Sequence, residues 1–264
     1  MKLDIGDLKK RLQTRAALAV TLESARTVLS VVRRGPGIAQ SDREFVLPIG
    51  AEALITDPVK AGQALAALLQ TERIRERRCV VSVPPGWAMT TTGEIPEMSP
   101  EDLRGFMELR AEREFPSAVS DLRIAFDSYR APDGKDRATL VAIPSKRVAA
   151  VEQMLEEAGC KAISISLGLD ACLSDVSEQG AVHFLSNCDH VDVVVTASGG
   201  IAAIRSLAGP VAASEVPFDA ANFCREVRIT LGRLPETVRQ QVRQAHFSGA
   251  SRASETLCRS TRDH

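Results

Sequence analysis

The first residues that could do chemistry lie at the centre of an apolar stretch, ALAVTLESARTVLSVVRR, at 17–34. Apolar runs on both sides of the segment 23–26 predict two strands joined by a tight turn. A hairpin tip can hold a phosphate when its backbone N–H groups approach the anion, and glycine normally permits that approach. Here the tip is Glu-Ser-Ala-Arg. The pattern leaves open a phosphate site or an ordinary turn.

A second group of reactive side chains consists of His183, Cys188, Asp189 and His190. A metal ion would need such residues to converge, whereas alternation along a strand sends neighbours to opposite faces. We therefore interpret them as strand and turn residues. The cysteines show no zinc-ligand spacing, which predicts small buried residues in a reducing compartment. They are Cys79, Cys160, Cys172, Cys188, Cys224 and Cys258. No nucleophile–base pair or carboxylate pair stands out.

Three further motifs favour structural interpretations. Ser198-Gly199-Gly200 lies between two apolar runs, which indicates a hairpin turn and not a phosphate loop. The charge run ERIRERR at 72–78 follows a predicted helix and suits a solvated face, with contact to anionic lipid as the alternative. Trp87 follows Pro-Pro-Gly, and we expect it to pack, with an exposed anchor for a partner as the alternative.

Composition narrows the function classes. The chain has 264 residues, of which 44% are hydrophobic and 25% charged, as in ordinary globular proteins. Its 33 basic and 34 acidic residues give a net charge of −1, which argues against a nucleic-acid partner. Aromatic residues make up only 4%, so base-stacking platforms are also disfavoured. The charged first residues and the lack of a long apolar run predict a cytoplasmic protein without a signal peptide.

The elements that would position these residues follow an α/β pattern. Asp57-Pro58 and Ser99-Pro100 are typical helix starts, and Ser145 and Gly159 bracket a third helix. Asp133-Gly134 predicts a type I′ hairpin, and the Gly-Pro-Gly segment at 33–45 predicts a loop. Residues 80–160 thus read as a compact β-β-α-β-β-α unit. The second half repeats the opening pattern, with a strand and helix after 160, a three-strand meander at 181–207, a helix from about 218, a short strand and a last helix. This repetition indicates a duplicated architecture.

Several segments, taken in order, resemble the type IV pilus assembly protein PilM and the cytoplasmic actin-like domain of the type II secretion protein GspL. They are VPPGW, EIPEMSPEDL, ELRAEREFP, TLVAIPSKRVAAVEQMLEEAGCKAISIS, GGIAAIRSL and REVRITLGRLP. The resemblance covers roughly residues 16–250. It implies an α/β, actin-like (ribonuclease H-like) fold of two halves with an inserted small subdomain, as in the cell-division protein FtsA, and a shortened second half. The implied division is 1–80 for the first half, 81–160 for the inserted subdomain, and 161–264 for the rest.

The resemblance also implies where a nucleotide would bind. Relatives carry an acid and a glycine at each hairpin tip and a lysine after the first. Here the first tip has Thr21 and Glu23, with the lysine position near Val28, and the second has Leu185, Ser186 and Asn187. Glu23 places a negative charge where phosphate belongs, and two like charges at ~4 Å repel by about 4 kcal/mol. The implied positions are Thr21, Glu23, Ser24, Asn187 and Gly249, all read as degenerate, with no catalytic residue and no metal site.

The function that the resemblance implies is a cytoplasmic scaffold of a pilus or secretion platform. Its expected partner is the N-terminal cytoplasmic tail of a PilN-like inner-membrane protein, bound in a groove near residues 86–130. Contact with the membrane would go through that partner, and a homo-oligomer is compatible with the sequence. We expect no cofactor and no ATP hydrolysis. The alternative is an ATP-binding switch or weak ATPase of the same family, with ATP and Mg²⁺; a third reading is an unrelated pathway that reuses the fold.

Overall fold

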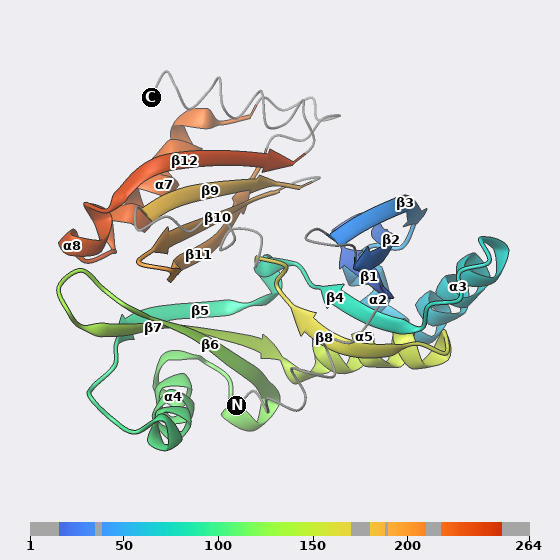
Figure 1. Cartoon of the computed structure of the whole chain (residues 1–264), viewed down its shortest axis with the longest axis horizontal. Coiled ribbons are helices and arrows are strands. Elements are labelled where there is room, and N and C mark those ends of the chain that lie inside the picture. The colour runs from blue at the N-terminus through green and yellow to red at the C-terminus, as the bar shows by residue number, and fades with distance from the viewer. Residues whose placement is uncertain (1–15, 35–38, 170–179, 188–189, 210–217, 250–264) are drawn as a thin grey trace. The chain divides into compact units, whose positions relative to one another are not determined.

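The computed structural model describes residues 16–34, 39–169, 180–187, 190–209 and 218–249 (Figure 1). It forms two compact units. Unit 1 comprises Met1–Pro84 and Ser145–Gly168, and unit 2 comprises Pro85–Pro144 and Leu169–His264. The division at residues 80 and 160 that the resemblance implies stays a prediction. No helix within the described ranges is long and apolar enough to cross a membrane.

Unit 1 is built on a five-stranded sheet, called here the first sheet, in the order β3-β2-β1-β4-β8. The first three strands form an antiparallel meander, and β4 and β8 extend it in parallel. The strands are β1 (Ala16–Leu22), β2 (Thr27–Arg34), β3 (Ala39–Leu47), β4 (Arg78–Ser82) and β8 (Lys161–Ser166). The confirmed hairpin of β1 and β2 is therefore joined to the sheet on both sides.

Among the described residues, unit 1 also contains the helices α2 (Ala51–Thr56), α3 (Pro58–Thr71) and α5 (Ser145–Glu157). The Asp57 side chain accepts from the Lys60 N–H, which confirms the predicted start of α3. Helices α3 and α5 pack together at Gly62, where a Cβ would lie 2.4 Å from that of Glu157. Glycine is therefore required at this crossing. Leu65, Leu69, Val151, Met154 and Leu155 are buried on the two helices.

Unit 2 contains a four-stranded sheet, called here the second sheet, in the order β11-β10-β9-β12. Its strands are β9 (Gly180–Ser186), β10 (His190–Ala197), β11 (Gly200–Ala208) and β12 (Val242–Gly249). Strands β9 to β11 form an antiparallel meander and β12 pairs with β9 in parallel. The first sheet has the same arrangement in β1 to β4, which confirms the duplicated α/β architecture. Helix α7 (Ala220–Gly232) and α8 (Glu236–Arg239) contribute Phe223 and Val238 to the core of the second sheet.

The remaining part of unit 2 is a three-stranded sheet, called here the small sheet, in the order β5-β7-β6 (Figure 1). Its elements are η1 (Pro85–Trp87), β5 (Met89–Glu94), α4 (Pro100–Glu114), η2 (Val119–Asp121), β6 (Leu122–Arg130) and β7 (Asp136–Pro144). The Ser99 side chain accepts from the Asp102 N–H, as predicted for the start of α4. Alternation sends Leu140 and Ala142 toward Met107 of α4, while Thr139 points to the opposite face.

The turn chemistry differs from the prediction in one place. Gly134 alone has a positive φ in the β6–β7 turn, and its N–H donates to the Ala131 carbonyl, so this is a three-residue loop with a glycine bulge and not a type I′ turn. The type I′ geometry belongs to Ser198 and Gly199, with φ values of 48° and 83°.

Other expectations have different outcomes. Strand β3 begins at Ala39, inside the segment predicted as a loop. Helix α3 is followed by the run at 72–78 as predicted, and the short helix α8 was not predicted. The helices predicted after β8 and after Gly249 fall largely or wholly outside the described residues.

Candidate functional site

The tip of the first hairpin is closed by its own backbone and held against α2. The Glu23 N–H donates to the Arg26 carbonyl at 2.8 Å, and the Glu23 carboxylate accepts from Arg26 Nε at 2.7 Å. The Glu23 carbonyl accepts from the Ala51 N–H at 2.9 Å. At Gly50 a Cβ would lie 1.9 Å from the Ser24 carbonyl oxygen. The tip therefore packs directly on the start of α2.

This packing bears on the predicted phosphate positions. Thr21 is an exposed strand residue, in register with Val28 on β2 and Ser82 on β4. The Glu23 N–H is occupied within the turn, and its carboxylate forms an ion pair with Arg26. A bound phosphate would have to displace these interactions and overcome the Glu23 charge. The geometry favours an architectural role for this tip.

The second hairpin, between β9 and β10, is fixed by a buried carboxylate that the sequence analysis did not single out. The Asn187 N–H donates to the His190 carbonyl at 2.9 Å, and Asn187 Nδ2 donates to Asp192 Oδ2 at 2.8 Å. Asp192 is 1% exposed, and its other oxygen accepts from the Ser206 hydroxyl of β11. His190 Nε2 lies 3.4 Å from Asp192 Oδ2. Asn187 is thus a structural partner of Asp192.

Gly249 lies beside this hairpin at the end of β12. It is in register with Ser186, and a Cβ on Gly249 would lie 2.3 Å from the Ser186 carbonyl oxygen. Its φ of 131° is one that other residues rarely adopt. Two predicted positions, Asn187 and Gly249, therefore belong to one corner of the second sheet. Thr21, Glu23 and Ser24 belong together at the first hairpin, in unit 1.

The other reactive residues of the sequence are placed as follows. His183 Nε2 is 3.2 Å from the Thr196 hydroxyl, and the His183 ring stacks on His246 at 5.0 Å. Within the described ranges no three His, Cys, Asp or Glu side chains gather as metal ligands, and Cys188 and Asp189 lie outside them.

Cys79 and Cys160 are buried free thiols, and the pKa of Cys79 is raised, chiefly by its hydrogen bond with Cys160. Trp87 is buried, in keeping with packing.

A line of threonines joins the small sheet to strand β11. Three hydroxyls donate to successive parts of that edge strand: Thr90 to the Ile204 carbonyl at 3.1 Å, Thr92 to Ala202 at 3.0 Å, and Thr139 to Ile201 at 2.5 Å. The Ile201 N–H donates to Asp127 of β6 at 2.8 Å. Side chains thus satisfy backbone groups that an edge strand would otherwise expose.

A cleft of about 420 Å³ lies along this joint. Its walls come from β5, β11 and the end of α7: Thr90, Thr91, Thr92, Ala202, Ala203, Ile204, Arg205, Thr230, Arg233 and Leu234. Arg205 pairs with Glu226 at 2.7 Å, whereas Arg233 forms no ion pair with any described residue. The cleft therefore combines hydroxyl groups, aliphatic surface and positive charge.

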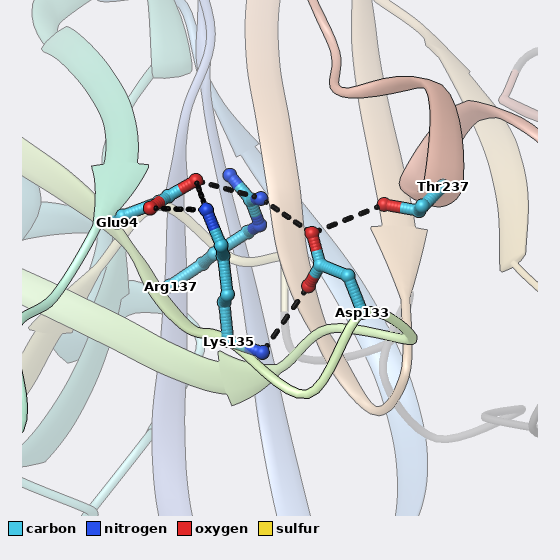
Figure 2. Close-up of polar contacts among 5 residues, drawn as sticks. All are labelled: Glu94, Asp133, Lys135, Arg137 and Thr237. Atoms are coloured by element: carbon cyan, nitrogen blue, oxygen red, sulfur yellow. Dashed lines mark hydrogen bonds and ion pairs between the residues drawn. The ribbon is translucent and has the colours of Figure 1, made fainter.

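Figure 2 shows the ion network at the other end of the same joint. The guanidinium of Arg137, which is 5% exposed, donates to Glu94 at 3.1 Å and to Asp133 at 2.8 Å. Lys135 Nζ pairs with Glu94 at 2.9 Å, and Thr237 of α8 donates to Asp133 at 3.3 Å. The hydrogen bond from Lys135 lowers the pKa of Glu94, and that from Arg137 lowers the pKa of Asp133. The network ties the β6–β7 turn to β5 and α8.

Comparison with known proteins bears on the fold. No protein-family model matches the sequence, and no curated protein matches it. Among solved structures, the chain is similar to a PilM–PilN type IV pilus biogenesis complex, at 17% identity and a TM-score of 0.60, over 85% of this chain and 72% of that one.

Two further structures agree. The cytoplasmic domain of EpsL, an inner-membrane component of the Vibrio cholerae type II secretion system, matches at 15% identity and a TM-score of 0.55, over 94% of this chain and 95% of its own. A Bacteroides thetaiotaomicron protein of unknown function with an actin-like ATPase fold matches at 11% identity and a TM-score of 0.54, over 96% of this chain and 89% of its own. The predicted actin-like fold is confirmed.

Proposed function

We propose that this chain is an actin-like scaffold in the inner-membrane assembly platform of a type IV pilus or a type II secretion system. The observation that supports the proposal is its similarity in fold to the structure of a PilM–PilN complex and to the cytoplasmic domain of EpsL. Fold alone does not assign function, so the proposal also draws on the resemblance in the order of sequence segments. In this role the chain lies in the cytoplasm and reaches the membrane through its partner.

The partner in this proposal is the N-terminal cytoplasmic tail of a PilN-like membrane protein, and its site is the cleft between β5 and β11. The cleft lies within unit 2, beside the segment 86–130 that the sequence analysis named. Its volume and mixed lining suit two or three side chains of an extended segment. Arg233 would supply a charge at the rim, where it affects association and orientation.

The scaffold needs no ATP hydrolysis in this proposal. The hairpin contacts support that view. The Glu23 carboxylate pairs with Arg26, and the Glu23 N–H donates to the Arg26 carbonyl within the turn. The Asn187 N–H donates to the His190 carbonyl. Neither group is then available as a phosphate ligand.

Thermal unfolding with two ligands tests the proposal. The synthetic N-terminal cytoplasmic tail of a PilN-like membrane protein from the same genome should raise the Tm by mass action, whereas ATP with Mg²⁺ should leave it unchanged. Arg233→Glu should weaken tail binding several-fold, and the matched variant Arg225→Glu, on the same helix outside the cleft, should not. A tail without effect on Tm at concentrations up to about 1 mM, which is roughly the weakest Kd expected of a specific site, would contradict the partner assignment.

The second candidate function is an ATP-binding switch. Gly249 favours it, because it is the implied nucleotide position that holds a glycine, and it approaches Ser186 closely. In that case Mg²⁺–ATP should raise the Tm, and Glu23→Gln should enlarge the rise by removing a repulsive charge. Either result would reverse our order of preference.

A further inference from the structure

Four exposed arginines of unit 1 surround a second pocket, of about 450 Å³. Arg33 comes from β2, Arg43 from β3, and Arg73 and Arg75 from the segment that follows α3. We call this site the arginine pocket. Its apolar lining includes Phe45, and the guanidinium carbon of Arg43 lies 4.8 Å from the centre of that ring. Residues distant in sequence thus gather four positively charged side chains around one cavity.

The two carboxylates of the pocket do not neutralise it. Glu72 pairs with Arg43 at 3.2 Å. Glu76 accepts from the backbone N–H groups of Arg77 and Arg78 at 3.2 and 3.1 Å, and lies 3.7 Å from Arg78 Nε. Among the residues that the structure describes, neither Arg73 nor Arg75 has a carboxylate at ion-pair distance. Arg73 and Arg75 thus contribute two positive charges that no described carboxylate pairs with, in a chain whose net charge is −1.

The backbone at Arg73 is unusual. Its φ is 53°, in the left-handed region, directly after the end of α3. The Ile74 N–H donates to the Leu69 carbonyl at 2.9 Å, and the Arg73 N–H to Gln70 at 3.1 Å, which is the Schellman ending of a helix. Glycine normally occupies this position, because a side chain is strained there. Strained backbone positions are often found at functional sites. Because Arg73 has such a backbone and also lines a charged pocket, we infer that the pocket holds a ligand.

We propose that the arginine pocket binds the phosphate group of a phosphomonoester, with Arg73 and Arg75 as the principal ligands. A guanidinium offers paired N–H donors that match phosphate oxygens. A phosphate presents three oxygens and nearly two charges, which several guanidinium groups can share, whereas a single carboxylate presents two oxygens and one charge. The volume is that of a small-ligand site. This inference does not rest on the proposed scaffold function.

Small phosphomonoesters and the lipid phosphatidic acid carry the same group, and two probes separate them. Titration calorimetry with glycerol 3-phosphate tests the small ligand. Sedimentation with phosphatidylcholine vesicles, with and without phosphatidic acid, tests the lipid. Binding to either probe that weakens as salt rises, and that depends on Arg73 and Arg75, supports the proposal.

The test variant is Arg73→Gly with Arg75→Gln. It should weaken binding by at least about 10-fold, since charge-assisted hydrogen bonds are lost. Arg73→Gly also removes the backbone strain, so its Tm should equal or exceed that of the wild type, and loss of binding cannot then be ascribed to unfolding. Arg225→Gln, an exposed arginine of α7, is the matched control and should bind normally.

Three outcomes would overturn the proposal. Neither probe binds the wild-type protein; or the double variant binds as well as the wild type; or polyglutamate displaces glycerol 3-phosphate at equal charge concentration, which would indicate a basic surface without selectivity for phosphate.

Discussion

The Ala51 N–H donates to the Glu23 carbonyl, and this hydrogen bond joins the first hairpin to α2. The Thr27 hydroxyl adds a second link, to the Ile49 carbonyl at 2.8 Å. Between them, Gly50 lies against the backbone of Ser24. The tip that resembles a phosphate-binding hairpin is thus held against the start of α2 in unit 1.

Substitution of Gly50 tests how firmly the tip is held. In Gly50→Ala the new Cβ would lie 1.9 Å from the Ser24 carbonyl oxygen, a backbone atom that cannot rotate away. We expect a loss of about 2–3 kcal/mol in the free energy of unfolding, measured with urea. Gly105→Ala is the control, because it lies within α4 with open space around it, and should stabilise by roughly 0.5–1 kcal/mol. Equal effects at the two sites would contradict the close packing.

Ser206 tests the buried carboxylate behind the second hairpin. Ser206→Ala removes a donor to Asp192, which is fully buried, and should cost about 1–3 kcal/mol of unfolding free energy. The exposed Ser128→Ala on β6 should stay within about 0.5 kcal/mol of the wild type. In the background of Asp192→Asn, the effect of Ser206→Ala should shrink, since the charge is gone. Additive effects would argue against the contact.

The ion network in Figure 2 predicts an acid-sensitive stability. The folded-state pKa values of Glu94 and Asp133 are lowered, so the unfolded chain binds protons first as the pH falls. Their contribution is present above the ordinary carboxyl pKa, about 4, and is lost as pH falls below it. The free energy of unfolding, measured with urea, should therefore decline as the pH is lowered from about 6 to about 3, a range that spans the ordinary carboxyl pKa.

Variants separate this network from general acid effects. Arg137→Gln and Asp133→Asn should each flatten the decline, because each removes the bond that lowers the pKa of Asp133. Arg130→Gln should not, since its guanidinium lies 3.8 Å from Asp136 in an exposed pair. A slope unchanged in both network variants would show that other carboxylates dominate.

Thr139 tests the joint between the small sheet and β11. Thr139→Val keeps the side-chain shape but removes the donor to the Ile201 carbonyl, at a cost of about 1–2 kcal/mol. Hydrogen exchange should quicken at Ile201, whose N–H is bonded to Asp127 in the same joint. Thr91→Val, on the face toward α4, should leave that exchange unchanged. Equal exchange rates at the Ile201 N–H in the two variants would show that the Thr139 hydrogen bond does not stabilise this joint.

Local signals predicted much of this fold. The capping residues Asp57 and Ser99 fixed two helix starts, and the repeated meander indicated the duplicated architecture. The turn types were harder to predict from the sequence. Asp133-Gly134 and Ser198-Gly199 are both typical of hairpins, and only the loop length, which the structure gives, distinguishes their turn types. The first part of strand β3 was not predicted, because the glycines and proline that precede it suggested a loop through residue 45.

The site was less predictable than the fold. Asp192 interrupts the apolar run VDVVV, and this lone acid was the available signal for a buried network. Its partner Ser206 lies on another strand, and the pairing register that joins them is not visible in sequence. The arginine pocket has the same origin, since Arg33, Arg43 and Arg73 meet only after β2, β3 and α3 have packed.

The threonine joint also constrains the order in which the protein can form during synthesis. The small sheet is complete in the growing chain once β7 has emerged, but Ile201, which accepts from Thr139, follows 62 residues later. At a ribosomal rate of roughly 5–20 residues per second, that interval lasts about 3–12 s. During it the threonine-bearing face stays hydrated, which its hydroxyls tolerate far better than an apolar face would. The hydroxyl groups on this face of the small sheet therefore suit a surface that is exposed to water until β11 has been synthesised.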